Sequence, residues 1–317
     1  MLRTILAAGA LAVSMAAGAQ PYPSKPVHIL VAFPPGGPTD IIARLIGAKL
    51  GDSLGQPVVV ENKVGASGNV ATGEVAKSAP DGYTLLVHSS AYAVNPTLFA
   101  NAGYDPAKDL LAVSVVASQA NIVLVNSSFP ARTLEELKSA MVKGKLAFAS
   151  PGSGTTPHLT AVNLFHVHWK ADATHIPFKG AGPAVAALLS GEPPIGVMAG
   201  SGPMSNIKSG KFRALAVSSA NRLPQLPDVP TLKELGYPGM EDYTWVGLFA
   251  PAGTPADIAQ KLNGAVLRAV HSEDLKQKLD GLAFEITAAP LRETADYVRS
   301  EVAKWAQVVR TTGAKAE

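Results

Sequence analysis

A glycine turn near the start of the chain holds the residues whose chemistry is easiest to infer. The turn, residues 34–38, reads Pro-Pro-Gly-Gly-Pro; it follows an apolar run over 27–33 and precedes a helical pattern over 39–54. A strand, a turn and a helix start in this order present amide N–H groups that lack acceptors and favour an anion. Gly36 and Gly37 also let the main chain approach a ligand closely. The turn predicts a site for a small carboxylate, in a protein that binds rather than reacts.

Asp40, in the first turn of that helix, has two interpretations. Its carboxylate complements the positive end of the helix dipole, and Arg44 stands four residues later, where the two side chains can pair. We favour a structural role in which Asp40 orders the turn, and we expect ligand contact from the backbone of residues 35–37. Asp40 and the preceding Phe33 stay among the candidate binding residues.

A second glycine turn repeats the arrangement. Residues 150–156 follow a short apolar strand pattern and precede a predicted helix over 157–165. His158 in that helix would either donate to a ligand or cap the helix start, and we favour the cap. Lys179 precedes another predicted helix, over 182–189, and is either a ligand contact or a solvated cation.

Common enzyme motifs fail at the turns where they would have to occur. A serine hydrolase of the α/β type needs G-x-S-x-G, and neither Ser67 nor Ser153 stands in that pattern. No glycine turn continues as a phosphate-binding G-K-[ST], and the run 152–157 breaks the dinucleotide pattern. We therefore expect no cofactor and no catalytic residues, although side chains distant in sequence could still converge.

Histidines and cysteines give little support for a metal site. His166 and His168 lie at the end of a predicted helix, where residues two apart diverge, and no spacing rule supports His158 or His175 as a third ligand. The chain has no cysteine, which excludes iron–sulfur clusters and cysteine catalysis. We expect no metal.

The first 19 residues have the features of an export signal. Arg3 precedes an apolar segment over 5–16 that is too short for a membrane span of about 20 residues, and Ala17-Gly18-Ala19 matches a cleavage site. We predict cleavage after Ala19 and a periplasmic protein; an uncleaved anchor is the weaker alternative. The formal net charge of +3 is too small to indicate binding of nucleic acid. We expect a monomer.

The elements that must position these turns alternate between strand and helix patterns, as in α/β folds. Thr133 and Glu136 form a capping box at the start of a helix. Thr254 is the expected N-cap of another helix, with Pro255 at its first position. The prolines between 222 and 238 suit a rigid connector near the point where the chain crosses back between domains. Strands are expected over 58–60, 84–87, 111–117, 122–125, 146–149, 213–217 and 243–250, and further helices over 68–76 and 291–310.

Two α/β lobes fit this order and the length of the chain. Ligands in open α/β sheets bind at the carboxyl ends of strands, where both glycine turns lie. We predict lobe 1 from residues 20–122 plus 238–317 and lobe 2 from residues 123–237, with a mixed sheet flanked by helices in each and a cleft between them.

The sequence resembles the Bug-type extracytoplasmic solute receptors of the tripartite tricarboxylate transporter family over essentially its whole mature length. The order and spacing of the shared segments make the resemblance specific. These segments are 22–27 (YPSKPV), 33–40 (FPPGGPTD), 61–68 (ENKVGASG), 80–85 (PDGYTL), 177–180 (PFKG), 226–231 (LPDVPT) and 245–255 (WVGLFAPAGTP).

The resemblance implies a periplasmic binding protein of the Venus flytrap type, in which main-chain donors hold one carboxylate of the solute. Met198 stands where many relatives have an acidic residue, which favours a non-amino organic acid over an amino acid and gives an apolar pocket wall. The implied binding residues are Pro35, Gly36, Gly37, Ser67, Ser89 and Ser90 in lobe 1 and Ser150, Gly154, Thr155, His158 and Lys179 in lobe 2, with the loop after 195–198 facing the cleft.

We therefore expect capture of a small organic acid by closure of the lobes and its delivery to the permease subunits of a tripartite transporter. A periplasmic sensor that passes its liganded state to a signalling partner is an alternative that the sequence does not separate from transport. A periplasmic hydrolase or isomerase is a weaker one.

Overall fold

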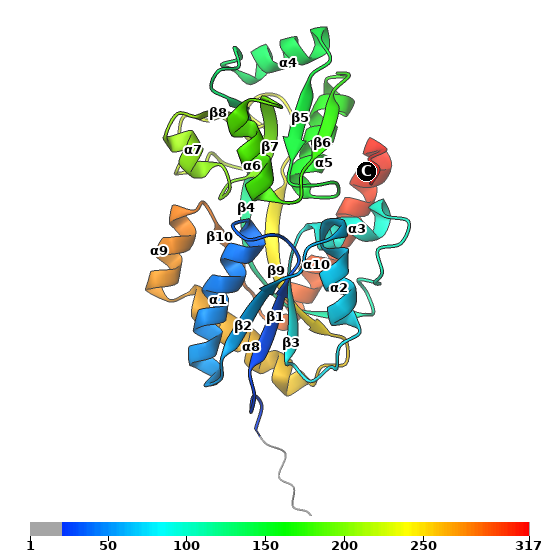
Figure 1. Cartoon of the computed structure of the whole chain (residues 1–317), viewed down its shortest axis with the longest axis vertical. Helices are drawn as coiled ribbons and strands as arrows, with labels where there is room; N and C mark the ends of the chain where they lie inside the picture. Colours follow the sequence, from blue (N-terminus) through cyan, green and yellow to red (C-terminus); the bar gives the residue numbers. More distant parts are fainter. Residues whose placement is uncertain (1–20, 317) are drawn as a thin grey trace, which may run out of the picture.

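One strand, β4 (Leu110–Asn126), runs through both halves of the molecule (Figure 1). The structure is a computed structural model and describes residues 21–316. Residues 110–120 of β4 pair with β9, whereas residues 121–126 pair with β7 and β8, so the strand changes partners along its length. These partners are β7 (Ile195–Ala199), β8 (Phe212–Val217) and β9 (Tyr243–Pro251).

Lobe 1, the lower half in Figure 1, is a mixed sheet covered by helices on both faces. Its strand order is β2-β1-β3-β9-β4, with β1 parallel to β2 and β3, and β9 antiparallel to β3. Its further elements are β1 (Val27–Val31), β2 (Val58–Asn62), β3 (Thr84–Ser89), β10 (Glu285–Ile286), α1 (Pro38–Leu54), η1 (Ala66–Gly68), α2 (Asn69–Ala76), α3 (Ala91–Leu98), α8 (Ala256–Val270), α9 (Glu273–Gly281) and α10 (Leu291–Thr312).

The alternation of side chains along β1 builds the core on both faces of this sheet. Val27, Ile29 and Val31 pack in the cluster that α1, α8 and α9 cover, whereas Leu30 packs in the cluster on the side of α2, α3 and α10. Successive strand residues point to opposite faces, so a buried strand needs apolar residues at every position. The strand end and the turn that follows it are thereby fixed in place.

Lobe 2, the upper half in Figure 1, continues from β4 through β7, β5 and β6, with β8 on the other side of β4. One core cluster includes residues of α4, α5 and η2, and another includes residues of α6 and α7. The further elements are α4 (Leu134–Lys143), β5 (Ala147–Ser150), α5 (Thr156–Val162), the π-helical turn η2 (Asn163–His168), β6 (Thr174–Pro177), α6 (Ala181–Ser190) and α7 (Met204–Lys208).

Most elements lie where the sequence predicts them, and the cap of α4 is confirmed, because the Thr133 hydroxyl accepts the Glu136 amide at 3.1 Å. Three details were wrong. The runs 111–117 and 122–125 form one strand, since buried polar residues interrupt its apolar pattern. The helix over 157–165 ends at Val162 and continues as η2. The Thr254 hydroxyl donates to Pro251 instead of capping α8.

The partners of β4 change close to the predicted boundary between the lobes. The pairing changes after Ala120, close to the predicted boundary at residue 122. The predicted proline connector, 222–238, lies between β8 and β9 without helix, and Thr231 forms a single bridge with Val217. The division at 122 and 237 remains our proposal. Over residues 21–316, no helix combines the length and apolarity needed to span a membrane.

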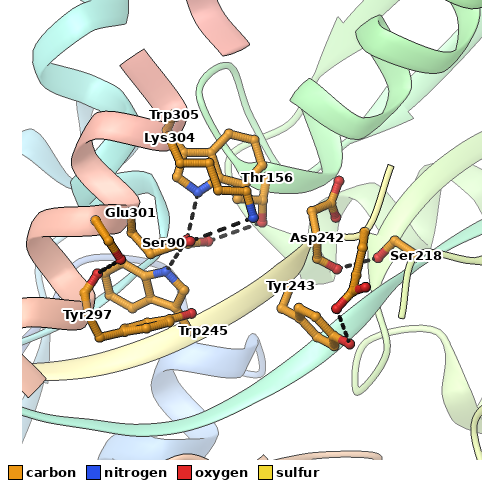
Figure 2. Close-up of polar contacts among 12 residues, drawn as sticks. Ser90, Thr156, Ser218, Asp242, Tyr243, Trp245, Tyr297, Glu301, Lys304 and Trp305 are labelled. Carbon is orange, nitrogen blue, oxygen red and sulfur yellow. Dashed lines mark hydrogen bonds and ion pairs between the residues drawn. The ribbon is translucent and has the colours of Figure 1, made fainter. Parts of the chain in front are cut away.

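Helix α10 is tied to β9 by a buried carboxylate, which Figure 2 shows. Glu301 is 7% exposed, and its Oε2 accepts the indole N–H groups of Trp245 on β9 at 2.9 Å and of Trp305 at 2.8 Å. The Lys304 ammonium lies 3.6 Å from the other carboxylate oxygen. Both indoles are buried, so loss of the acceptor would leave two buried donors unpaired.

We predict that Glu301→Ala lowers the free energy of unfolding by about 3 kcal/mol, because unpaired buried polar groups keep their desolvation cost. Glu301→Gln retains an acceptor oxygen and should lose clearly less. Urea unfolding measures both, and Gln307→Ala, at an exposed position of the same helix, is the control with an expected change within about 0.5 kcal/mol. Equal losses for Glu301→Ala and Gln307→Ala would contradict the role of this contact.

Candidate ligand-binding site between the lobes

The first glycine turn joins β1 to α1 at the junction of the lobes. Gly37 is the extended N-cap of α1, and the helix begins at Pro38. The Gly36 amide donates to Asp40 Oδ2 at 3.0 Å, and Pro35 has no N–H. Of the backbone that we expected to contact a ligand, only the Gly37 amide is therefore available, together with the first amides of α1 that have no acceptor within the helix.

The Asp40 carboxylate accepts hydrogen bonds from other residues of the protein. Burial alone would raise the pKa of its carboxyl, but hydrogen bonds from Arg44, Gly36 and Asn62 hold that pKa below its usual range. The predicted pairing with Arg44 is confirmed, with its Nε 3.0 Å from Oδ1. Asn62 Nδ2 also donates to Oδ1 at 2.9 Å. The carboxylate thus acts as an internal anchor that fixes the turn.

Directly behind this turn lies a small cavity, here called the inner pocket, with a volume of about 30 Å³. Helix α1 of lobe 1 and helix α6 of lobe 2 both begin at its wall. The Thr39 hydroxyl is buried there without a hydrogen-bond partner among the described residues. The wall consists of Phe33, Gly37, Pro38, Thr39, Ser89, Pro151, Thr155, Thr156, Pro157, Ala181, Ala199 and Thr244.

A larger cavity, here called the outer cavity, has a volume of about 500 Å³. Phe33 and Pro151 line both cavities, so the two adjoin each other. Both lobes contribute to its wall, which is formed by Ala32, Phe33, Val64, Gly65, Ala66, Ser67, Gly68, Phe99, Pro151, Gly152, Ser153, Pro177, Phe178, Lys179 and Gly180.

The second glycine turn is held by histidines behind it. The Gly154 amide donates to His158 Nδ1 at 3.2 Å, and the ring of His158 stacks on that of His175 with their centroids 4.0 Å apart. Burial lowers the pKa of His158 to about 4, and that of His175 to about 3. His158 is therefore neutral at pH 7 and accepts the Gly154 amide, which fits the capping interpretation.

The lobes meet directly at this turn. A Cβ on Gly154, whose φ is +83°, would lie 2.7 Å from Asn95 Oδ1 of lobe 1, so only glycine lets the turn approach α3 this closely. Nearby, the Ser67 hydroxyl donates to the Ser153 carbonyl at 2.5 Å. The Ser153 hydroxyl is buried and has no hydrogen-bond partner among the described residues.

A chain of buried hydrogen bonds, here called the hinge network, joins the lobes beside the inner pocket. It begins at Ser90, the residue before α3, whose hydroxyl lies 3.1 Å from that of Thr156 on α5 (Figure 2). The Thr156 hydroxyl lies 2.6 Å from that of Thr244 on β9, which donates to Asn121 Oδ1 on β4 at 2.7 Å. One polar network thus contacts both lobes and both connecting strands, β4 and β9.

The network ends at the carboxylate of Asp242, which is buried at the start of β9. Asn121 Nδ2 donates to Asp242 Oδ1 at 2.6 Å, and the Thr160 hydroxyl lies 2.8 Å from Oδ2. Burial raises the pKa of Asp242 to about 6, although these hydrogen bonds act in the opposite direction. The carboxyl is therefore ionised at pH 7 and takes up a proton in the folded protein more easily than an exposed aspartate does.

Most predicted binding residues lie at the junction of the lobes, but only some of them line a cavity. Phe33, Gly37, Ser67, Ser89, Thr155 and Lys179 line a cavity. Ser90, Asp40, Ser150, Gly154 and His158 hold the walls from behind, whereas Pro35 and Gly36 are exposed. Met198 is buried in the core cluster that includes α6 residues, and the next residue, Ala199, lines the inner pocket instead.

Sequence reasoning missed lining residues of two kinds. Thr39, Thr156 and Phe178 are each next in sequence to a predicted residue, namely Asp40, Thr155 and Lys179, so this position was a usable signal. Thr244 and Phe99 come from other parts of the chain, and no local pattern indicates them. Within residues 21–316, no group of three or more His, Cys, Asp or Glu side chains could hold a metal ion.

The comparisons with known proteins agree with this architecture. The family model of the tripartite tricarboxylate transporter family receptor matches residues 42–314. The chain belongs to this family. Its members are binding receptors and not enzymes, and the fold is that of a periplasmic binding protein.

Three solved structures place the receptor among proteins of known fold. It is similar to the periplasmic binding protein BugD, with a TM-score of 0.89, 32% identity and coverage of 93% of this chain and 100% of that one. Rpa4515 of Rhodopseudomonas palustris, solved with adipate, gives the same four values. MatC of the same organism, solved with malate, gives a TM-score of 0.85, 35% identity and coverage of 91% and 100%.

The pKa of Asp242 predicts a pH dependence of the receptor's stability. Between its ordinary value of 3.8 and about 6, the folded state binds the proton more strongly than the unfolded state, so the contribution of Asp242 to stability falls as pH rises through this window. Relative to Asp242→Asn, the wild type should lose about 3 kcal/mol of unfolding free energy between pH 3.5 and 7.

Urea unfolding of both proteins across this pH range measures the difference. Asp296→Asn, which changes an exposed aspartate on α10, is the control and should show no comparable trend. A constant difference between wild type and Asp242→Asn at all pH values would contradict the prediction.

Proposed function

We propose that this receptor captures a small organic acid by docking one carboxylate in the inner pocket, with the two lobes closing around the solute. The observation that carries the proposal is the convergence of the N-termini of α1 and α6 on a buried pocket where the Thr39 hydroxyl has no partner among the described residues. Helix N-termini attract anions. A buried hydroxyl without a hydrogen-bond partner costs folding free energy, and a bound ligand that forms this hydrogen bond would remove the cost.

The size of the required interaction is consistent with such a site. A change from a mostly open to a mostly closed population needs about 5.5 kcal/mol of preferential binding to the closed state. Hydrogen bonds to a charged group contribute roughly 1.5–3 kcal/mol each. Donors from both lobes, such as the first amides of α1 and α6 and the Thr39 hydroxyl, would therefore suffice only when the lobes are together.

Relatives support the chemical class of the ligand and the partner. The structures solved with adipate and malate both hold carboxylic acids. Receptors of tripartite tricarboxylate transporters act with membrane subunits, so we propose delivery to such a permease from the periplasm. The export signal over residues 1–19, which belongs to this proposal, lies outside the described residues.

The Thr39 hydroxyl provides the first test. Thr39→Val keeps the shape of the side chain and removes the hydroxyl, so the affinity for the best-bound acid of a carboxylate panel should fall by about ten- to a hundredfold. Isothermal titration calorimetry at fixed pH measures the affinity. Thr174→Val, at an exposed position on β6, is the matched control and should bind as the wild type does.

Two outcomes would contradict the proposal. One is that the wild type binds neutral or cationic solutes and no carboxylate. The other is that Thr39→Val and Thr174→Val bind a carboxylate equally well, which would place the carboxylate away from the inner pocket.

A further inference from the structure

The volumes of the two cavities divide the ligand into two parts. The inner pocket, at about 30 Å³, is far smaller than the outer cavity and has room for a small group of atoms such as a carboxylate rather than for a whole solute. The outer cavity, at about 500 Å³, lies within the range of small-molecule sites. Because Phe33 and Pro151 line both cavities, a solute anchored in the inner pocket would place its remaining atoms in the neighbouring outer cavity.

The wall of the outer cavity is largely apolar. Three phenylalanines from different segments, Phe33, Phe99 and Phe178, contribute partly exposed rings. Val64, from the segment before η1, keeps 44% of its surface exposed although it is an apolar residue. Apolar surface of this kind, gathered in a cleft, is typical of a site that takes apolar ligand atoms.

The polar side chains of this wall are few, and the Ser67 hydroxyl is already used by the protein. The Ser67 hydroxyl donates to the Ser153 carbonyl, which leaves the Ser153 hydroxyl as the other side-chain hydroxyl of the wall. No carboxylate or amide side chain belongs to the wall. A solute with several hydroxyl groups would find few side-chain partners there for the hydrogen bonds that it makes to water.

The layer behind Phe33 is also uncharged at neutral pH. His88 packs edge-on to the Phe33 ring with their centroids 5.6 Å apart, and burial lowers the pKa of His88 to about 4. Its Nε2 faces the backbone of Gly68, where a Cβ would lie only 2.2 Å away. This side of the cavity therefore offers the solute a neutral surface.

Lys179 is the single charged residue of this wall. Its side chain belongs to the turn before α6 and is exposed, and no ion pair with another described residue occupies it. This cation would attract a second anionic group on the part of the solute that lies in the outer cavity.

We propose that the solute is an organic acid with an apolar body, an aliphatic chain or a ring, and with a second anionic group at the end near Lys179. This inference rests on the proposed function and specifies its substrate class. The anchor in the inner pocket would hold any carboxylate, whereas the phenylalanine wall would select against polyhydroxylated acids of the same length.

A matched pair of probes tests the apolar body. Adipate and galactarate have the same six-carbon chain and two carboxylates, but galactarate carries four hydroxyl groups. Calorimetry should show adipate binding at least about tenfold more tightly, because the wall leaves most of these hydroxyls unpaired. Hexanoate, which lacks the second carboxylate, should bind more weakly than adipate, and Lys179→Met should remove that difference.

Phe178→Asn should bring the affinities for adipate and galactarate closer together, because it replaces an apolar ring of the wall with a polar amide. Phe129→Asn is the matched control: Phe129 is half-buried in lobe 2 and lies outside both cavities, so a general loss of stability would appear there without a change in the ratio.

The outcomes separate this inference from the proposed function. If galactarate binds as tightly as adipate and both depend on Thr39, the carboxylate anchor stands and the apolar body is wrong. If hexanoate equals adipate in the wild type, the role of Lys179 is wrong. If no carboxylate binds at all, the proposed function fails with it.

Discussion

Where the two lobes meet, buried polar groups need hydrogen-bond partners, and this requirement shapes the whole junction. Unpaired buried donors and acceptors cost the full desolvation penalty, so the chain pairs them wherever it can. Asn121 and Asp242, on the two strands that cross between the lobes, pair with each other. Ser90 and Thr156 pair across the lobes. The Thr39 hydroxyl beside the inner pocket has no such partner among the described residues, and this is where the proposed ligand would bind.

The same requirement explains why Asp242 is tolerated at the start of β9. A lone buried carboxylate would be expensive, yet here Asn121, Thr160 and the distant charge of Lys304 all favour its ionised form. Burial outweighs them and keeps the pKa raised. The crossing strands are thus joined by an interaction that is strong only while every member of the network is in place, which couples the position of α5 to that of β9.

Local order in the sequence was enough to place the first glycine turn between β1 and α1, whereas long-range packing decides which other residues line the cavities. Gly37 lies at the inner pocket because an apolar strand, two glycines and a proline-led helix can be joined in few ways. Met198 was expected to form a pocket wall, but neighbouring strand residues point to opposite faces, so Ala199 lines the pocket and Met198 enters the core. Thr244 reaches the pocket only because β9 returns alongside β4, which no local pattern indicates.

Affinity and selectivity are assigned to different parts of such a site. The proposed anchor would use backbone amides and one hydroxyl, groups that many sequences can supply at a strand–turn–helix junction, and would recognise a carboxylate without regard to the rest of the solute. The side chains of the outer cavity, with Phe33, Phe99 and Phe178 among them, are the part that substitution can change freely. Relatives with the same fold hold adipate and malate, acids that differ in length and polarity while sharing their carboxylates. Differences of this kind between family members are therefore expected in the outer wall, with the inner pocket left as it is.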